Sequence, residues 1–364
     1  MQLGGSSNDA THSFPTVRGE QAGRPFYLAV CPLRLVPTLF RFDEEDLPAE
    51  VRAQRTLNHA RVPEIASYLA SNPDSYVLSA LCASIDCAVK FVPLEVSDAQ
   101  GVVGVLRVPT GAKILINDGQ HRRAAIESAL RRRPELGDDN VPVLFFVDVG
   151  LKRSQQMFAD LNKYAIRPSH SLSTLYDHRD STSELARYLS QNCAVFKGLT
   201  EVERSTISNR STKLFTLSSI KHASRALLRK RGKEGISEIE KLLALDYWEA
   251  VGEAIPDWGR ARAREVATAE LRVKFIHAHG VALQALGIAG AELLARRPKD
   301  WRAAVRKLRT IDWSRDNALW ATRALRHGRV SKATTSVRLT ANVIKRNLGL
   351  ELTLQDLALE ETLT

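Results

Sequence analysis

The ten residues from Ile114 to Arg123, ILINDGQHRR, concentrate the side-chain types that could do chemistry. Their apolar start predicts a strand, the glycine a tight turn, and the polar end the first turn of a helix. A helix start offers unpaired backbone N–H groups and the positive end of the helix dipole, which together favour a phosphate. The candidates are Asp118, Gln120 and His121 for catalysis and Gly119, Arg122 and Arg123 for binding a nucleotide or phosphate. Asp118 could hold a metal ion or orient water; alternatively, it caps the helix and the arginines are solvated.

A second polar cluster follows the apolar run Val141–Val149, on a helix that the spacing predicts over 151–164. Ligands collect at the carboxyl ends of strands in α/β domains, so Asn162 and Arg167 are further candidate nucleotide or phosphate contacts. The segment DHRD at 177–180 extends this cluster. A salt-bridge network would explain the same density of polar side chains, and the pattern leaves both interpretations open.

The sequence lacks the motifs of several common enzyme classes. GxxxxGK[ST], GxGxxG and HExxH are all absent, which excludes a standard P-loop NTPase. Cys82 and Cys87 have no nearby histidine, and His277 and His279 would lie on different faces of a predicted helix. The sequence therefore predicts no metal site.

Charge is distributed unevenly along the chain, whose net charge is +11. Residues 1–203 hold 22 basic and 24 acidic side chains, residues 204–346 hold 30 and 13, and residues 347–364 hold four acidic and no basic ones. A nearly neutral first part joined to a strongly basic second part predicts a polyanionic partner, with nucleic acid as the leading candidate. A solvated, arginine-rich helical surface is the alternative.

Two stretches of the basic part predict DNA contacts, one at the end of a helix and one in 317–348. The second has a predicted helix, a turn at His327–Gly328 and another helix, which is the outline of a helix-turn-helix. The candidate DNA-contacting residues are Arg229, Lys230 and Arg231 in the first stretch and Arg338, Lys345 and Arg346 in the second. An ordinary two-helix hairpin would show the same outline.

The elements needed to position these residues predict an α+β protein. A flexible arm is expected over 1–25, a mixed α/β domain over 26–170 and a basic α-helical domain over 171–364. Apolar runs predict strands over 76–85, 89–96, 113–117 and 141–149, and a helix over 121–133. After residue 170 the spacing is helical throughout, including one long helix over 260–286.

Composition and termini predict a soluble, cytoplasmic protein with no membrane partner. The chain is 44% hydrophobic and 26% charged, which excludes extensive disorder. Its longest apolar runs, such as Val141–Val147, are too short to span a bilayer, and residues 1–13 lack the pattern of a secretory signal. Four cysteines without a close CxxC pair are typical of free thiols in a reducing compartment.

The segment Asp118–Arg122 also carries a recognisable signature, DGQHR. Five further segments accompany it: Phe14–Gly19, Cys31–Pro37, Ala53–Asn58, Arg61–Ile65 and Ser169–Asp180. Together they resemble the DndB family, the accessory proteins of bacterial DNA phosphorothioate (sulfur) modification systems. The resemblance is dense over the first half of the chain and looser over the helical half.

This resemblance implies a DNA-binding negative regulator of the modification genes. Its partners would be the double-stranded promoter DNA of the modification operon and other proteins of the modification system, and an oligomer is compatible with this role. The resemblance also makes Cys31 and Arg34 candidates for a DNA-contacting or redox-sensitive element, although a lone cysteine is more typical of a small buried side chain.

The DGQHR turn is similar, distantly, to the strand–turn–helix of ParB-like domains and related restriction proteins, which bind or hydrolyse nucleotides without a Walker motif. This similarity implies the alternative function, a nucleotide-binding or nucleotide-hydrolysing accessory enzyme that acts on DNA. The regulator requires no cofactor, whereas the enzyme would take ATP or another nucleoside triphosphate with Mg²⁺.

Overall fold

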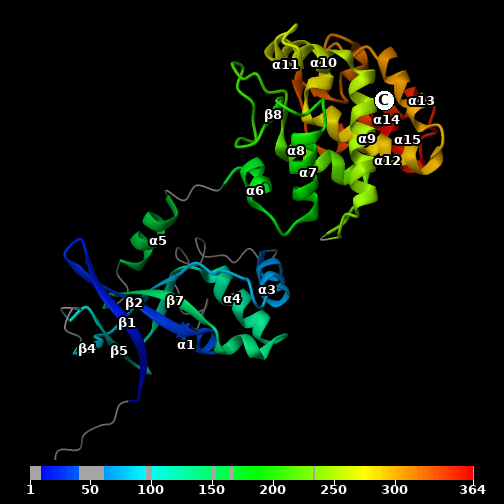
Figure 1. Cartoon of the computed structure of the whole chain (residues 1–364). Helices are drawn as coiled ribbons and strands as arrows, with labels where there is room; N and C mark the ends of the chain where they lie inside the picture. Colours follow the sequence, from blue (N-terminus) through cyan, green and yellow to red (C-terminus); the bar gives the residue numbers. More distant parts are fainter. Residues whose placement is uncertain are drawn as a thin grey trace, which may run out of the picture. The chain divides into compact units, whose positions relative to one another are not determined.

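The computed structural model describes residues 10–40, 61–95, 101–149, 153–163, 168–232 and 234–363. The chain divides into two compact units, Met1–Ile166 and Arg167–Thr364 (Figure 1). We call the first the sheet unit and the second the helical unit. The predicted α+β class is confirmed, because a seven-stranded mixed sheet precedes a C-terminal region made mainly of helices.

The sheet unit contains one mixed sheet in the order β4-β5-β1-β2-β7-β3-β6. Its strands are β1 (Thr11–Gln21), β2 (Arg24–Pro32), β3 (Leu81–Ile85), β4 (Lys90–Pro93), β5 (Val103–Pro109), β6 (Ile114–Asp118) and β7 (Asn140–Val147). All neighbours pair antiparallel except β3 and β7, which run parallel. A two-residue turn, Ala22–Gly23, joins β1 to β2 with positive φ at both positions, as a type I′ hairpin turn requires.

Residues 11–21, predicted to belong to a flexible arm, instead form β1. Phe14 and Thr16 are buried while Pro15 and Val17 are exposed, which is the alternation of a strand with one face on a core. Proline is rare inside sheets, so Pro15 conceals this pattern in the sequence. Only the pairing of β1 with both β2 and β5 reveals it.

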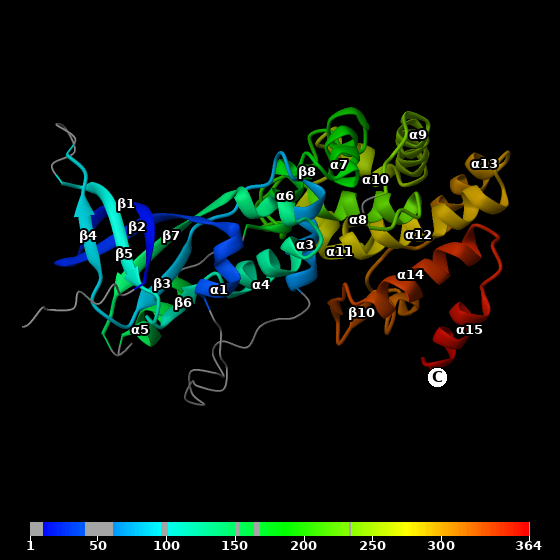
Figure 2. The ribbon, with the colours of Figure 1, turned by 90° about the horizontal axis from the view of Figure 1, so that it is seen from below.

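The helices of the sheet unit are α1 (Val36–Leu39), α3 (Arg61–Ser71), α4 (Gln120–Leu130) and α5 (Ser154–Lys163). α3 packs against α4, and α5 packs against β6 (Figure 2). The core includes the ring of Phe145, whose centroid lies 6.0 Å from that of Phe14 and 6.1 Å from that of Phe40. β6 and the start of α4 are therefore held by packing on several sides.

The helical unit contains two short strand pairs and a series of helices. The helices are α6 (His170–Tyr176), α7 (Ser181–Asn192), α8 (Leu217–Leu227), α9 (Glu238–Ala254), α10 (Pro256–Arg262), α11 (Thr268–Lys274), α12 (Gly280–Arg296), α13 (Trp301–Val305), α14 (Thr334–Asn347) and α15 (Leu354–Glu361). The strands are β8 (Thr200–Glu201), β9 (Phe215–Thr216), β10 (Leu325–Arg326) and β11 (Arg329–Val330). None of the helices among the described residues combines the length and the apolar character that crossing a membrane requires.

The helix α12 lies at the centre of this unit and packs against both α8 and α14. Glycines allow α12 to approach α8 closely. A Cβ added at Gly287 would lie 2.2 Å from the Ala223 carbonyl oxygen, and one added at Gly280 would lie 3.2 Å from Ser219 Cβ. The earlier glycine lies near the earlier residue of α8 and the later glycine near the later one, so α8 and α12 run in the same direction. Both helices therefore begin at the same end of the unit.

Candidate functional site

The predicted strand–turn–helix around the DGQHR sequence is confirmed. β6 ends at Asp118 and α4 begins at Gln120, with Gly119 between them at a φ of 109°. A Cβ at this position would lie 2.5 Å from Leu81 Cδ2. Both the left-handed backbone and the close approach of Leu81 therefore require glycine.

Arg122 holds this turn to the start of β3. Its Nη1 donates to the carbonyl oxygens of Ser79 and Ala80 at 2.8 and 2.7 Å, and its Nη2 lies 2.7 Å from Asp118 Oδ2. Asp118 therefore pairs with Arg122 and forms no side-chain hydrogen bond that caps α4. The guanidinium group stabilises the fold, and little of its hydrogen-bonding capacity remains for a ligand.

Arg123 has a similar anchoring role on the other side of α4. Its Nε donates to the Phe40 carbonyl oxygen at 3.0 Å and its Nη2 donates to that of Pro37 at 2.9 Å, while Nη1 pairs with Glu127 at 2.7 Å. The interpretation of Arg122 and Arg123 as solvated side chains is wrong, since both are four-fifths buried and bind backbone carbonyls.

Two buried amides accompany the turn. Asn117 is fully buried and donates through Nδ2 to Ser84 Oγ at 2.7 Å. Within the described part of the chain, Asn117 Oδ1 and Gln120 Nε2 have no hydrogen-bond partner. Gln120 is 8% exposed, so this candidate catalytic residue lies inside the unit rather than on its surface. Sequence reasoning missed Asn117, because its type and its place in an apolar strand gave no chemical signal.

A cavity of about 400 Å³ opens beside the turn, and we call it the DGQHR groove. Its lining residues are Arg61, Ile65, Tyr68, Val77, Leu78, Ser79, Asp118, Gly119, His121 and Arg122. The predicted residues Asp118, His121 and Arg122 thus share one groove with the exposed cation Arg61 from α3. The exposed Arg61 guanidinium, with the His121 imidazole beside it, could bind a phosphorylated ligand.

The second predicted cluster is only partly described. Asn162 belongs to α5, which packs against β6, and Arg167 lies outside the described residues, as does the segment 53–58. Asp180 caps α7 and pairs with Lys221 at 2.5 Å. Burial raises the pKa of Asp180, but hydrogen bonds from Lys221 and Thr182 outweigh burial and lower it to about 2. For Asp180, the salt-bridge interpretation therefore holds.

Cys31 does not lie on the surface. Its side chain is fully buried in the core of the sheet unit, and burial raises the pKa of its thiol to about 12. A thiol in this environment is neither a nucleophile nor a DNA contact, which contradicts the predicted role. Arg34 is exposed and forms a 2.6 Å ion pair with the exposed Asp138, so it stays accessible.

The basic segment at the end of α8 divides into two kinds of side chain. Arg229 and Arg231 are exposed, whereas the Lys230 ammonium pairs with Glu240 at 2.7 Å and is 14% exposed. Arg229 has a left-handed φ of 52°, which ends the helix at this position. Of the three predicted residues, Arg229 and Arg231 are therefore accessible to DNA.

The predicted helix-turn-helix of 317–348 is wrong. Its first helix is replaced by one 3-10 turn, Ala318–Trp320, and by the β10–β11 hairpin. Thr322 and His327 adopt left-handed conformations with φ of 65° and 48°, which no helix can contain. Trp320 is fully buried and stacks on Trp313 with ring centroids 5.2 Å apart, so aromatic packing favours the irregular path.

The second predicted reading element, α14, is a helix, but it is mostly buried. Lys345 is 5% exposed, and its ammonium lies 2.6 Å from Asp356 and 2.9 Å from Glu292. Arg338 also pairs with Asp356, at 3.5 Å, and Arg346 lies 3.7 Å from a carboxylate of α15. Lys345 cannot read DNA from this position, and the acidic C-terminal segment neutralises much of the charge of α14.

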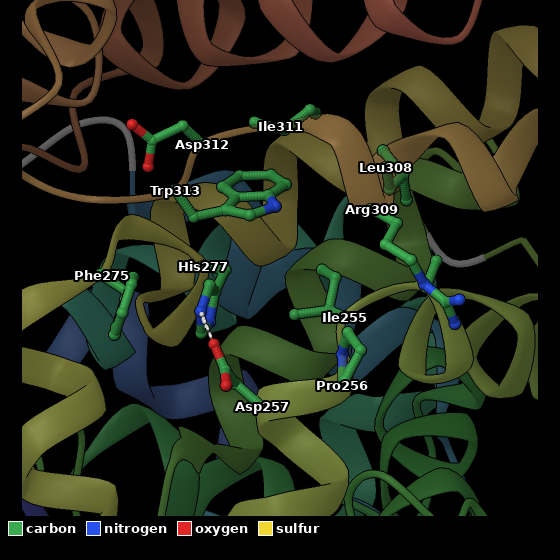
Figure 3. Close-up of a pocket in the computed structure, with 11 residues that line it drawn as sticks. Ile255, Pro256, Asp257, Phe275, His277, Leu308, Arg309, Ile311, Asp312 and Trp313 are labelled. Atoms are coloured by element: carbon green, nitrogen blue, oxygen red, sulfur yellow. Dashed lines mark hydrogen bonds and ion pairs between the residues drawn. The ribbon is translucent and has the colours of Figure 1, made fainter.

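A second cavity, of about 200 Å³, lies beside His277 in the helical unit (Figure 3). His277 Nδ1 accepts from Trp258 Nε1 at 3.1 Å, so Nε2 carries the proton that faces Asp257 Oδ2 at 3.3 Å. The cavity lining contains no hydroxyl or thiol that this pair could activate. The arrangement therefore stabilises the packing of α10 and offers no nucleophilic chemistry.

His277 and His279 do not lie on one helix, since 260–286 forms α10, α11, a 3-10 turn and the start of α12. The two imidazoles have different partners, and His279 Nε2 donates to the Arg272 carbonyl oxygen at 2.8 Å. Among the described residues, no group of three His, Cys, Asp or Glu side chains is placed to hold a metal ion.

Comparison with known proteins adds one finding to this geometry. A family model described as DndB, DNA-sulfur modification-associated, matches residues 14–351. The chain belongs to the DndB family. Neither a curated protein nor a solved structure matches it. Membership of the DndB family associates the protein with DNA sulfur modification, as the resemblance implied.

In this DndB-family chain, the predicted site residues divide by location. Asp118, Gly119, His121 and Arg122 line one groove of the sheet unit, whereas Gln120 is buried and Arg123 binds the Phe40 carbonyl oxygen. The predicted DNA contacts of the helical unit divide further into exposed and neutralised side chains. Tertiary packing, rather than residue type, separates the two groups.

Proposed function

We propose that this DndB-family protein is a DNA-binding negative regulator of the genes of a DNA sulfur-modification system. Family membership supports the association with sulfur modification. The charge of the helical unit supports double-stranded promoter DNA as its partner, because cations without a protein counter-charge are free to neutralise phosphates.

The observation that carries this proposal is a set of exposed cations in the helical unit for which the described residues provide no carboxylate. The set includes Arg204, Arg210, Arg229, Arg231, Arg329 and Lys332. Some exposed cations of the unit are already paired, such as Lys274, which lies 2.8 Å from Glu270. The unpaired cations replace the predicted helix-turn-helix as the proposed DNA contacts.

A salt titration of DNA binding tests this proposal. The affinity for a fluorescent duplex from the protein's own upstream promoter is measured by anisotropy, against a scrambled duplex of equal length. We expect tighter binding to the promoter and a linear fall of log K with log salt. An affinity that depends on neither the DNA sequence nor the salt concentration would overturn the regulator proposal.

Variants that remove positive charges then test which residues contact the DNA. The double variant Arg229→Gln/Arg231→Gln removes two proposed phosphate contacts, so the slope of the salt dependence should become shallower by about 2. Lys274→Gln is the matched control, because its ammonium is already paired with Glu270, and it should leave the slope unchanged. An equal effect of both variants would indicate a general loss of charge rather than a defined contact.

A second candidate function, nucleotide binding or hydrolysis, is favoured by one observation, the DGQHR groove. The groove combines Asp118 and His121 at the start of α4 with Arg61, and its volume of about 400 Å³ suits a nucleotide. The distant similarity of the turn to ParB-like domains also supports this candidate, with ATP and Mg²⁺ as the expected ligands.

Calorimetric titration with ATP and Mg²⁺, followed by a phosphate-release assay, tests the second candidate. Arg61→Gln should weaken nucleotide binding without changing the fold, because Arg61 is exposed. Asp118→Asn should abolish turnover, if turnover occurs, while leaving nucleotide binding measurable. Failure of the wild-type protein to bind any nucleotide would remove this candidate.

A further inference from the structure

A third cavity, of about 360 Å³, lies in the helical unit where α8 and α12 both begin, and we call it the Lys332 pocket. Its lining includes Thr216, Ser219, Arg272, His279, Arg315 and Lys332. The three cations come from α11, from the segment before Trp320 and from the segment before α14. No carboxylate lines the pocket among the residues that the structure describes.

Among the described residues, no carboxylate forms an ion pair with any of these three cations. The Arg272 guanidinium donates only to carbonyl oxygens, those of Lys213, Ser208 and Ser211. Arg315 likewise donates to backbone carbonyls, of Val273 at 3.2 Å and Gly328 at 2.9 Å.

Lys332 has no hydrogen bond or ion pair with any described residue. Three like charges around one cavity repel one another, and an anion in the cavity would remove this repulsion.

The start of α12 adds further positive potential. α12 has 17 residues, and no side chain caps its N-terminus. A Cβ at Gly280 would lie 3.5 Å from Lys332 Nζ, so the ammonium lies directly beside the first residue of the helix. A cation at this end of a helix is repelled by the helix dipole, whereas an anion between them is attracted by both.

The positive charges around the pocket also affect the pKa values of two neighbouring histidines, His279 and His222. Burial and the charges of Arg315, Lys332 and Arg272 together lower the pKa of His279 to about 4, although its hydrogen bond to the Arg272 carbonyl oxygen acts in the opposite direction. Burial and nearby positive charges, including Lys332, also lower the pKa of His222. Both imidazoles are therefore neutral at pH 7 and do not compete with an anion.

We propose that the Lys332 pocket binds the phosphate group of a nucleotide. Arg272 and Arg315 are held by carbonyl oxygens in fixed orientations, Lys332 supplies a mobile ammonium, and the uncapped start of α12 supplies backbone N–H donors. The volume exceeds that of a phosphate alone, so part of the attached sugar enters as well. The nucleotide is either a unit of a DNA strand or a free nucleotide.

The test compares Lys332→Gln with Lys274→Gln, whose ammonium belongs to the same unit but pairs with Glu270. Lys332 is exposed, so its replacement should leave the fold intact, which circular dichroism would verify. Calorimetric titrations use inorganic phosphate and 5′-AMP, and anisotropy measurements use the promoter duplex over a range of salt concentrations. Arg315→Gln, which removes the second cation, is the supporting variant.

If the source is a free nucleotide, wild-type protein binds phosphate and 5′-AMP, and Lys332→Gln weakens both by about tenfold or more. If the source is DNA, the free ligands do not bind, and Lys332→Gln makes the salt slope shallower by about 0.9. Lys274→Gln should change neither quantity.

The proposal is overturned if Lys332→Gln changes neither free-ligand affinity nor the salt slope. That result would leave DNA regulation standing, because promoter preference is measured on the wild-type protein. Conversely, phosphate binding without promoter preference would retain the pocket and reject the regulator.

Discussion

Replacement of Lys345 by methionine should separate a structural from a DNA-reading role of α14. Lys345 is 5% exposed and pairs at 2.6 and 2.9 Å with Asp356 and Glu292, which are 4% and 9% exposed. Methionine fills a similar volume but removes the buried cation that Glu292 and Asp356 share, which leaves them only the partly exposed Arg296 and Arg338 as partners. Removing one partner of a buried ion pair costs about 3 to 5 kcal/mol, so we expect the helical unit to lose that much stability.

Urea denaturation followed by circular dichroism would measure this loss. The triple variant Lys345→Met/Glu292→Gln/Asp356→Asn should recover most of it, because no uncompensated charge remains. The loss in Lys345→Met should also shrink as the pH falls from 7 to 5. Buried carboxylates that lose their buried cation have raised pKa values, and an acid whose pKa is raised in the folded state stabilises that state as the pH falls.

DNA binding by the same variant completes the test. At a temperature where Lys345→Met is fully folded, its affinity for promoter DNA should equal that of the wild type, since the ammonium is inaccessible. A variant that loses less than about 1 kcal/mol of stability but binds DNA much more weakly would refute the reasoning.

Three further predictions concern the turn of the sheet unit and the Lys332 pocket. Gly119→Ala should destabilise the protein by about 1 to 3 kcal/mol in urea denaturation, because φ is 109° and Leu81 Cδ2 would lie 2.5 Å from the new Cβ; a neutral effect would mean that the turn can relax. Arg122→Ala should cost about 2 to 3 kcal/mol in the same assay, because buried carbonyls lose a charged donor, and Arg131→Ala, at an exposed position of the same unit, is its control. The pKa of His279 in the folded protein is about 4, below its ordinary value. The contribution of His279 to the free energy of unfolding is therefore complete above pH 6.5 and should fall by about 2 to 3 kcal/mol as the pH drops towards 4. His279→Gln should remove this part of the pH dependence of unfolding, and an unchanged pH profile would contradict the assignment.

The strand–turn–helix at 114–123 was predictable because each of its signals is local. An apolar run, a glycine and a polar helix start follow one another along the chain, and no distant residue is needed to recognise them. The role of Arg122 was not predictable in this way. Its partners, Ser79 and Ala80, lie more than 40 positions earlier, and only the pairing of β3 with β6 brings them to the turn.

The helix-turn-helix prediction failed for a related reason. Helical spacing over 317–327 is real in the sequence, but the burial of Trp320 against Trp313 and the left-handed residues at 322 and 327 override it. Similarly, the charge of Lys345 is visible in the sequence, whereas its neutralisation depends on Glu292 of α12 and Asp356 of α15. A charge count cannot separate an accessible cation from one that already has a buried partner.

The sequence by itself determined the α+β class, the DGQHR turn, the basic character of residues 204–346 and the family. These properties depend on residue type and on spacing within a few turns of the chain. The tertiary structure alone decided which cations remain available. It places Arg272, Arg315 and Lys332 around one cavity although they are up to 60 positions apart, and it buries Lys345. Burial and counter-charge depend on contacts between distant segments, and these contacts exist only once the chain is folded.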